Sequence, residues 1–187
     1  MLDYLFSIDV GILKFINQDL QFPLFDFLFP YFTNLHKINW VAWGIFPLIA
    51  GFWYFKERKR SYKIFFALLI TAGMSDAIGY RVLKPAVQRV RPNNRPEIAK
   101  DLRLLRDPQS YSFPSNHAMN SFAVVGILVS YHPVLKWFLF PMAIIISLCR
   151  VYAGVHYPSD IIFGAFLGLL LAWSLKKYFF SRFKIFN

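Results

Sequence analysis

The sequence of 187 residues contains one cysteine and few acidic residues. With Cys149 alone, the chain cannot form an internal disulfide bond or a metal site built from several cysteines. The ten Asp and Glu residues are outnumbered by 21 Lys and Arg residues, which gives a formal net charge of +11. In a soluble protein a positive charge of this size would suggest a nucleic-acid partner.

Apolar residues make up 57% of the sequence and aromatic residues 20%, and the mean hydropathy is +0.42. A soluble domain is rarely so apolar, so the chain is predicted to be an integral membrane protein with one domain, residues 1–187. In such a protein Lys and Arg set the topology, contact anionic head groups or bind phosphate, and no nucleic-acid partner is expected. No cleavable signal peptide is predicted, because the first 20 residues hold three aspartates and lack a basic start.

The apolar pattern predicts an all-α fold of about six transmembrane helices in one bundle. Residues 1–18 have one apolar face, on which Asp9 intrudes, and are expected to form an amphipathic helix in the membrane interface. A short first spanning helix is the alternative for this segment. The predicted spans are 23–35, 39–55, 64–83, 116–131, 134–150 and 158–175.

Two basic clusters predict the orientation in the membrane. Residues 56–60 and the tail from Lys176 to Lys184 are rich in Lys and Arg, which favours the cytoplasmic side for both. Four crossings lie between them, so the loop 84–115 and the turn 150–157 are expected to share the non-cytoplasmic face. The loop is itself basic, against the usual tendency. Either the topology is inverted or these cations bind an anionic ligand.

The first group of candidate site residues lies at the end of the third predicted span. Lys84 and Arg91 are seven residues apart, so a helix ending at Pro92 would place both on one face, where they could bind phosphate oxygens. The structural alternative is that each reaches the lipid head groups. Asp76, two turns earlier, is expected to pair with Arg81 or Lys84, since an unpaired acid within a span is unfavourable.

The second group, Pro114-Ser115-Asn116-His117, opens the fourth predicted span. Ser115 is a good N-cap, and the first amides of the helix can bind an anion near His117. The alternative is a capping serine beside an interfacial histidine.

The third group is Arg150, His156 and Asp160, placed between two apolar segments. Pro158 suits the first turn of a helix, so Asp160 is expected one turn inside, within reach of one nitrogen of His156. That contact would fix the tautomer and leave the other nitrogen as a nucleophile. A polar loop between two spans is the structural alternative.

These three groups resemble, in order and spacing, the three motifs of the type 2 phosphatidic acid phosphatase superfamily. Two positions depart from the usual pattern. Asn116 replaces the glycine of Pro-Ser-Gly-His, and Cys149 replaces the serine that usually precedes the arginine of the third motif. The resemblance implies a hydrolase without metal or cofactor, in which His156 forms a phosphohistidine, Asp160 orients it and His117 is the general acid. It further implies phosphate binding by five residues: Lys84, Arg91, Ser115, Asn116 and Arg150.

The same resemblance implies a phospholipid or glycolipid substrate and a site on the periplasmic face of the inner membrane. Among bacterial members, lipid A 1-phosphatase is the favoured activity. Undecaprenyl-diphosphate and phosphatidylglycerophosphate phosphatases are the alternatives. From other classes, an anionic-lipid binding or transport protein would explain the arginines but not His156 and Asp160, and a vanadate haloperoxidase would be soluble. The motifs contain no information on oligomeric state.

Overall fold

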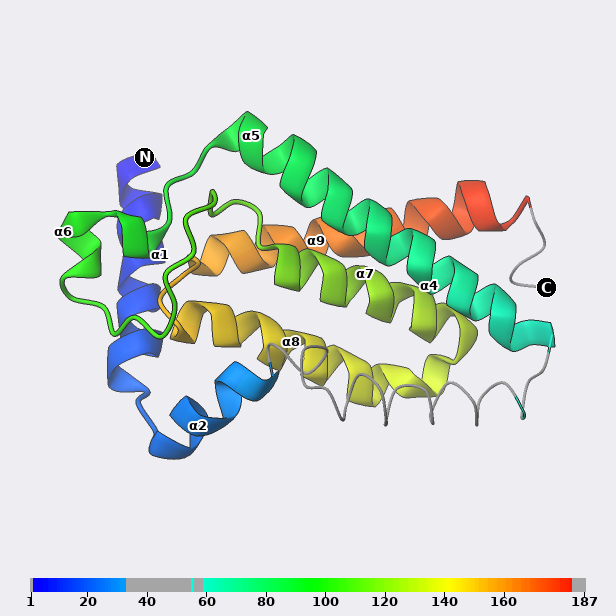
Figure 1. The fold of residues 1–187 in the computed structure, drawn as a ribbon, viewed down its shortest axis with the longest axis horizontal. Coiled ribbons are helices and arrows are strands. Elements are labelled where there is room, and N and C mark those ends of the chain that lie inside the picture. Colours follow the sequence, from blue (N-terminus) through cyan, green and yellow to red (C-terminus); the bar gives the residue numbers. More distant parts are fainter. Residues whose placement is uncertain (1, 33–54, 56–58, 183–187) are drawn as a thin grey trace.

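A computed structural model describes residues 2–32, 55 and 59–182, and every regular element in these residues is helical (Figure 1). The N-terminal part comprises α1 (Leu2–Lys14), the π-helical turn η1 (Phe15–Asp19) and α2 (Pro23–Phe32). One long helical stretch is formed by α4 (Lys59–Ala77), η4 (Ile78–Leu83) and α5 (Lys84–Val87). The short helices η5 (Pro92–Asn94) and α6 (Pro96–Ala99) follow. The remaining elements are α7 (Asn116–Tyr131), η6 (Pro133–Leu135), α8 (Lys136–Tyr152), α9 (Pro158–Ser174) and η7 (Leu175–Phe180).

The long helices run lengthwise beside one another, while α1 lies across one end of them (Figure 1). Helix α7 is central, because it packs against α4, α8 and α9. Its sequence has no charged residue, as a helix surrounded by other helices requires.

Two glycines of α9 allow this helix to approach the backbone of α7. A Cβ atom at Gly168 would lie 2.3 Å from the carbonyl oxygen of Met119, and one at Gly164 would lie 2.8 Å from that of Ser115. Small residues permit such close packing of helices in membranes. The contact also places the start of α7 against the start of α9, where the Ser115 amide donates to the Asp160 carbonyl at 3.1 Å.

The buried apolar side chains form separate clusters along the bundle. The cluster far from α1 joins α4, α7, α9 and η7 around residues such as Ile64 and Ile127. The cluster beside α1 includes Leu13, Ile98 and Tyr157, from α1, α6 and the start of α9. Helix α1 is therefore part of the packed structure at this end of the bundle.

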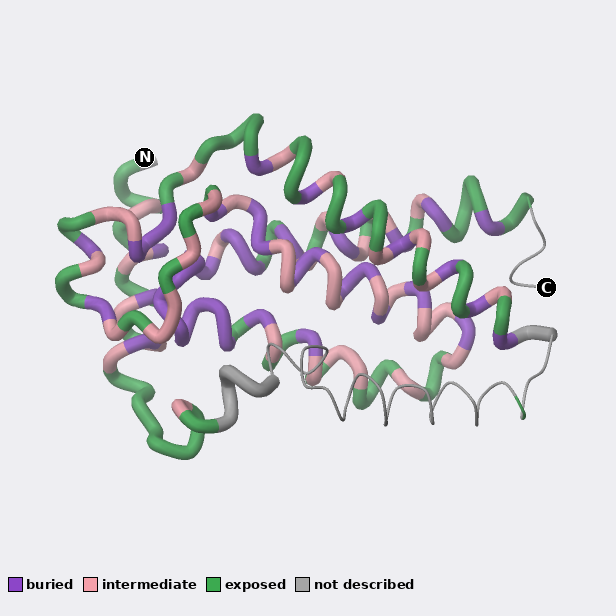
Figure 2. Tube along the Cα trace, viewed as in Figure 1, coloured by how far each residue is buried: buried purple, intermediate pink, exposed green. Residues whose placement is uncertain are grey.

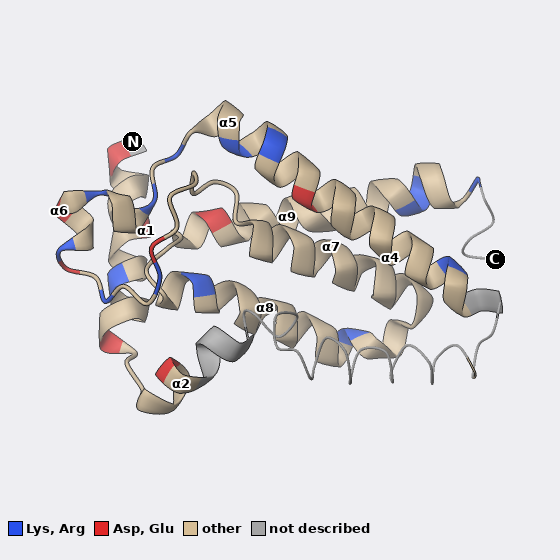
Figure 3. Ribbon diagram, in the orientation of Figure 1, with Lys and Arg blue, Asp and Glu red and all other residues tan. Residues whose placement is uncertain are grey.

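The surface of the bundle matches a lipid environment. Large apolar side chains such as Leu69, Trp137, Ile162 and Phe166 are more than half exposed, and exposed positions recur along the helices (Figure 2). Charged residues lie mainly toward the ends of the bundle, apart from those within the α4–η4 stretch, and α7 has none (Figure 3). Three described stretches are long and apolar enough to cross a membrane: Ser61–Ala99, Pro133–Tyr152 and Pro158–Phe180.

Helices occupy the last four predicted spans, as α4 with η4, α7, α8 and α9. Three of these four lie in the stretches that are long and apolar enough to cross a membrane, and α7, with 16 residues, does not. The predicted second span, 39–55, lies almost entirely outside the described residues. Of the first, 23–35, the described part is the helix α2. Residues 2–19 are helical as expected, whereas the count of six spans and the interfacial position of α1 stay predictions.

Candidate active site

The turn between α8 and α9 places a histidine and an aspartate in contact. Gly154, with φ of 73°, reverses the chain after α8, and Pro158 occupies the first turn of α9. As expected from the sequence, Asp160 lies one turn inside this helix, with Oδ2 3.2 Å from Nδ1 of His156. The Tyr157 amide donates to the same oxygen at 3.0 Å. His156 and Asp160 are 2% and 0% exposed, so bulk water does not compete for their contact.

The partner of the other ring nitrogen fixes the tautomer of His156. Nη1 of Arg91 lies 3.0 Å from Nε2 of His156 and also donates to the carbonyl of Val155 at 2.8 Å. A guanidinium group can only donate, so Nε2 accepts and the ring proton is on Nδ1, facing Asp160. This arrangement leaves the lone pair of Nε2 directed at the buried guanidinium of Arg91.

Arg91 reaches this position by a route that the sequence spacing did not predict. The helix ends at Val87, because Gln88 has a φ of 52°, and Arg91 itself is extended with φ of −70° and ψ of 155°. The interpretation of one helix ending at Pro92, with Lys84 and Arg91 on the same face, is therefore wrong. Extended geometry is what proline imposes on the residue before it, and it turns Arg91 toward the catalytic turn.

Lys84 is buried nearby but does not contact His156. Its amine donates to the backbone carbonyls of Tyr111 and Ser112, in the loop that leads to α7. It is 4% exposed. Lys84 thus fixes the backbone just before Ser115 and places a basic group in the buried region.

At the start of α7, Ser115 takes the N-cap position but its hydroxyl makes no capping hydrogen bond. This Oγ atom is buried without a partner among the described residues. Buried polar atoms are normally satisfied, so an unpaired hydroxyl at a helix N-terminus is suited to an anion. His117 lies two residues further, on the first turn of the same helix, and is half-buried.

Arg150 completes the set at the end of α8. It is 5% exposed, and its Nε atom has no hydrogen-bond partner within the part of the chain that the structure describes. The structure thus joins Arg91, His156, Asp160 and Ser115 by direct contacts and places Lys84, His117 and Arg150 on the elements around them.

The charges around this cluster do not balance. Among the described residues, its basic side chains are Lys84, Arg89, Arg91, Arg106 and Arg150, while its carboxylates are Asp9 and Asp160. Basic groups therefore outnumber the carboxylates. A phosphate monoester dianion carries negative charge that would compensate this excess, and buried charges are stable only when compensated.

Burial lowers the pKa of His156 to about 3, although the hydrogen bond to Asp160 opposes this shift. The imidazole is therefore neutral at neutral pH, the state in which it can act as a nucleophile. In the unfolded chain its pKa is about 6.5. Between these two pKa values the unfolded state binds a proton on His156 and the folded state does not. The contribution of His156 to the free energy of unfolding is therefore fully present above pH 6.5 and is lost as the pH falls toward 3.

This difference gives a measurable pH dependence. Between pH 6 and 4 we expect the detergent-solubilised protein to lose up to about 1.4 kcal/mol of stability per pH unit through His156 alone. The His156→Asn variant lacks the titrating group and should show a shallower decline in the thermal midpoint. Parallel pH profiles for the two proteins would contradict the assignment of a neutral, buried His156.

Asn116, which replaces the usual glycine of the second motif, directs its side chain at the helix α4–η4. Its Nδ2 donates to Asp76 at 3.1 Å, and its Oδ1 would meet a Cβ atom at Gly79 at 2.8 Å. Asn120, one turn later, donates to the same carboxylate oxygen at 3.3 Å. The expected pairing of Asp76 with Arg81 or Lys84 is therefore wrong, because the two amides of α7 satisfy this acid instead.

We accordingly expect Asn116→Gly to leave kcat within about threefold of the wild type. Stability should fall by about 1 kcal/mol through the lost hydrogen bond and the added glycine. The matched control is Asn120→Ala, which removes the other amide from Asp76 and should lower the thermal midpoint similarly. Rates of phosphate release and thermal midpoints of the two variants test this, and a tenfold change in kcat for Asn116→Gly alone would show that the side chain reaches the substrate.

Sequence reasoning missed three residues of this site. Ser112 donates from its hydroxyl to Oδ2 of Asp160. Arg89 donates to Oδ1 of Asp160 at 2.6 Å, and Asp9 of α1 accepts from Arg89 at 2.6 Å. The available signal was Asp9 itself, an acid on the apolar face of a predicted helix.

The fold is an apolar helical bundle with helices long enough to cross a membrane, and at one end it buries a histidine–aspartate pair among basic side chains. The model of the PAP2 superfamily matches residues 60–184, so the chain belongs to this superfamily. It is accordingly an enzyme, a phosphoric ester hydrolase.

Three similar proteins illustrate the relationship. The lipid A 4′-phosphatase of Bacteroides thetaiotaomicron is 30% identical over 92% of this chain and 77% of its own length. The crystal structure of the transmembrane PAP2-type phosphatidylglycerolphosphate phosphatase from Bacillus subtilis superposes with a TM-score of 0.69 and 26% identity. It covers 94% of this chain and 86% of the other. For Aquifex aeolicus LpxE the TM-score is 0.65 and the identity 28%, over 90% and 94% of the two chains.

Proposed function

We propose that this protein is a metal-independent lipid phosphatase that removes a phosphate group from lipid A through a phosphohistidine at His156. The observation that carries this proposal is the hydrogen-bond pattern of the ring. Asp160 binds the Nδ1 side and a buried arginine faces Nε2. This pattern produces a neutral nucleophile whose reactive lone pair already faces a cation that can bind phosphate.

In the first step, Nε2 of His156 attacks phosphorus in line with the leaving oxygen. The N–P bond forms as the P–O bond to the lipid breaks, and His117 gives its proton to the departing oxygen. The ring becomes cationic, and the carboxylate of Asp160 compensates this charge across Nδ1. Arg91 must leave Nε2 and turn to a phosphoryl oxygen, beside Lys84, Arg150 and the first amides of α7.

In the second step, water attacks the phosphohistidine while His117 accepts the proton from that water. The P–N bond breaks, inorganic phosphate leaves, and His156 returns to its neutral state. The buried cations stabilise the equatorial oxygens in both steps, which is the main contribution that proteins make to phosphoryl transfer.

Lipid A is the favoured substrate because the Bacteroides relative, a lipid A 4′-phosphatase, matches 92% of this chain. That relative makes the 4′-phosphate the first position to examine and the 1-phosphate, which the sequence analysis favours, the second. Undecaprenyl diphosphate and phosphatidylglycerophosphate present the same phosphate chemistry and are the comparison substrates.

The proposed enzyme is a single domain of about six spans in the inner membrane, with α1 lying in the interface on the periplasmic side. The position of α1 across the end of the bundle that holds the site supports this arrangement (Figure 1). A lipid head group at that surface would reach the site without leaving the bilayer.

The test is phosphate release by the purified protein from lipid A, undecaprenyl diphosphate, phosphatidylglycerophosphate and phosphatidic acid, with and without chelator. Mass spectrometry of the lipid A product distinguishes loss of the 4′-phosphate from loss of the 1-phosphate. We expect release from lipid A at an unchanged rate in chelator. Activity that disappears in chelator and returns with a divalent metal would overturn the mechanism, and release only from another lipid would replace the substrate.

A further inference from the structure

Asp160, the proposed partner of the nucleophile, is held on both of its oxygens. Oδ2 receives the donors from His156, Tyr157 and Ser112, whereas Oδ1 accepts from Nη1 of Arg89 at 2.6 Å. A carboxylate bound through only one oxygen can still rotate about that oxygen. The hydrogen bond from Arg89 to Oδ1 therefore fixes the orientation of the Asp160 carboxylate.

Arg89 is itself held in place by the N-terminal helix. Its Nη2 donates to Oδ2 of Asp9 at 2.6 Å, and its Nη1 also donates to the Ser159 hydroxyl at 2.7 Å. The guanidinium lies 4.0 Å over the ring of Tyr157. Few alternative positions satisfy these contacts together, so Arg89 is a fixed donor rather than a mobile surface cation.

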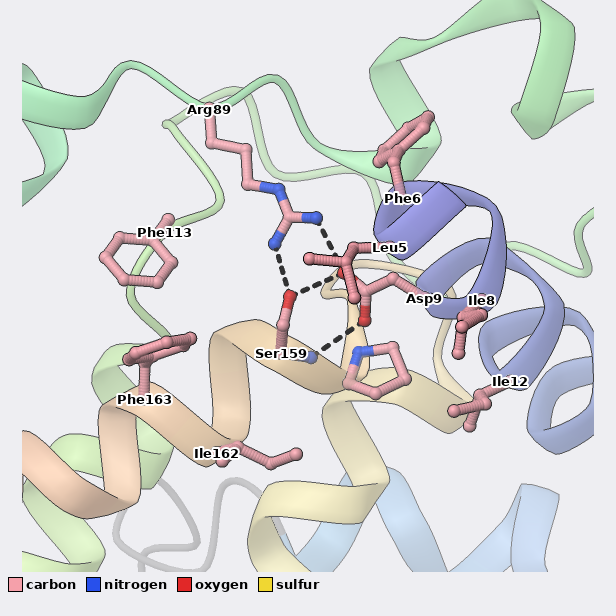
Figure 4. Close-up of a pocket in the computed structure, with 11 residues that line it drawn as sticks. Leu5, Phe6, Ile8, Asp9, Ile12, Arg89, Phe113, Ser159, Ile162 and Phe163 are labelled. Atoms are coloured by element: carbon pink, nitrogen blue, oxygen red, sulfur yellow. Dashed lines mark hydrogen bonds and ion pairs between the residues drawn. The ribbon is translucent and has the colours of Figure 1, made fainter. Parts of the chain in front are cut away.

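Asp9 connects α1 to the first turn of α9. Besides Arg89, its carboxylate accepts the amide of Ser159 at 2.9 Å and the Ser159 hydroxyl (Figure 4). An acid at this point satisfies an amide that the helix leaves without an internal partner. Asp9 is 8% exposed, so α1 inserts a buried negative charge beside the active site.

The surroundings of this ion pair strengthen it. The pair lies at a cavity of about 550 Å³ between α1 and α9, and the side chains around it are mainly apolar (Figure 4). The apolar residues include Leu5, Ile8, Ile12, Phe113, Ile162 and Phe163. Charges interact more strongly where water is displaced by such side chains.

We propose that Asp9 and Arg89 are positioning residues for the phosphatase reaction: Asp9 fixes Arg89, which fixes Asp160, which orients His156. The N-terminal helix, outside the matched residues 60–184, thereby completes the active site. This proposal rests on the proposed function, because it assigns to Asp9 and Arg89 a role in the step that His156 performs.

The test compares purified wild type, Arg89→Gln and Asp9→Asn, with lipid A as the substrate and phosphatidic acid in parallel. Asp9→Asn retains an oxygen that can accept the Ser159 amide, so α1 should stay docked while its charge is lost. We expect kcat to fall about 10- to 100-fold for Arg89→Gln and about tenfold for Asp9→Asn. KM should stay within about threefold, because neither residue contacts the substrate.

Double variants separate positioning from a general loss of structure. Since Asp9 acts through Arg89, the variant with both changes should have the kcat of Arg89→Gln alone, and Arg89→Gln should add little to Asp160→Asn. Arg89→Lys keeps the positive charge but loses the second guanidinium nitrogen, so its kcat should lie between those of Arg89→Gln and the wild type. Multiplicative losses, or losses that follow the thermal midpoint, would overturn the proposal.

The matched control breaks another ion pair of α1. Lys14 and Asp101 are 2.6 Å apart and partly exposed, and this ion pair includes neither Asp9, Arg89 nor Asp160, so Lys14→Gln should leave kcat unchanged. His156→Ala distinguishes the positioning role of Asp9 and Arg89 from the phosphatase mechanism itself. If His156→Ala is inactive while folded Arg89→Gln and Asp9→Asn keep the wild-type kcat, the positioning role is wrong and the phosphatase mechanism stands. If His156→Ala keeps full activity, the mechanism itself fails.

Discussion

His156→Ala should lower kcat for phosphate release by at least about 10³-fold, which corresponds to about 4 kcal/mol of transition-state stabilisation. The reason is that His156 places an unprotonated ring nitrogen 3.0 Å from the buried guanidinium of Arg91, where a phosphoryl group can be bound and attacked. The measurement is phosphate release from lipid A by purified protein, together with lipid binding in the same detergent.

The binding measurement distinguishes an enzyme from a lipid-binding or transport protein. For the enzyme, His156→Ala should still bind the lipid, because Lys84, Arg150 and the start of α7 are unchanged. Trapping with radiolabelled substrate should give an acid-labile phosphoenzyme in the wild type and none in the variant. A phosphoenzyme that persists in His156→Ala would place the nucleophile elsewhere.

Asp160→Asn is expected to have a similarly large effect, about a 10³-fold loss in kcat. The two oxygens of the carboxylate accept hydrogen bonds from four groups. The amide of asparagine has only one oxygen, and an NH2 donor replaces the other. A donor facing Nδ1 favours the tautomer with the proton on Nε2, which removes the nucleophilic lone pair. The variant should also leave the positive charge of Arg89 partly uncompensated and so lower the thermal midpoint.

Ser112→Ala is the control for this substitution. It removes one donor from Oδ2 of Asp160 but preserves the carboxylate and the tautomer, so kcat should fall by no more than about tenfold. Equal losses for the two variants would mean that hydrogen bonding to Oδ2, and not the tautomer of His156, governs the reaction. Nitrogen-15 chemical shifts of the His156 ring would report the tautomer directly.

The sequence predicted the helices and the turn between α8 and α9 well because both depend on local patterns. The segments that became α7, α8 and α9 are marked by their apolar composition, and Pro158 places Asp160 one turn into α9. The contact between His156 and Asp160 follows from that spacing alone. For His156 and Asp160, proximity in sequence was thus enough to predict the contact.

The positions of Arg91, Asp76 and Asp9 could not be predicted in this way, because each depends on tertiary packing. The helix before Arg91 ends at the left-handed residue Gln88, which no turn signal in the sequence marks. Asp76 accepts hydrogen bonds from two side-chain amides of α7 rather than pairing with a basic residue of its own helical stretch. Asp9 meets its partners 80 and 150 residues further along the chain.

These long separations determine when the site can form during synthesis. Helix α1 is made first, yet the groups that bind its aspartate belong to the loop after α5 and to the last long helix. The residues up to the start of α9 must therefore leave the ribosome before Asp9 can meet Arg89 and Ser159. We expect chains in which α9 has not yet packed into the bundle to lack phosphatase activity.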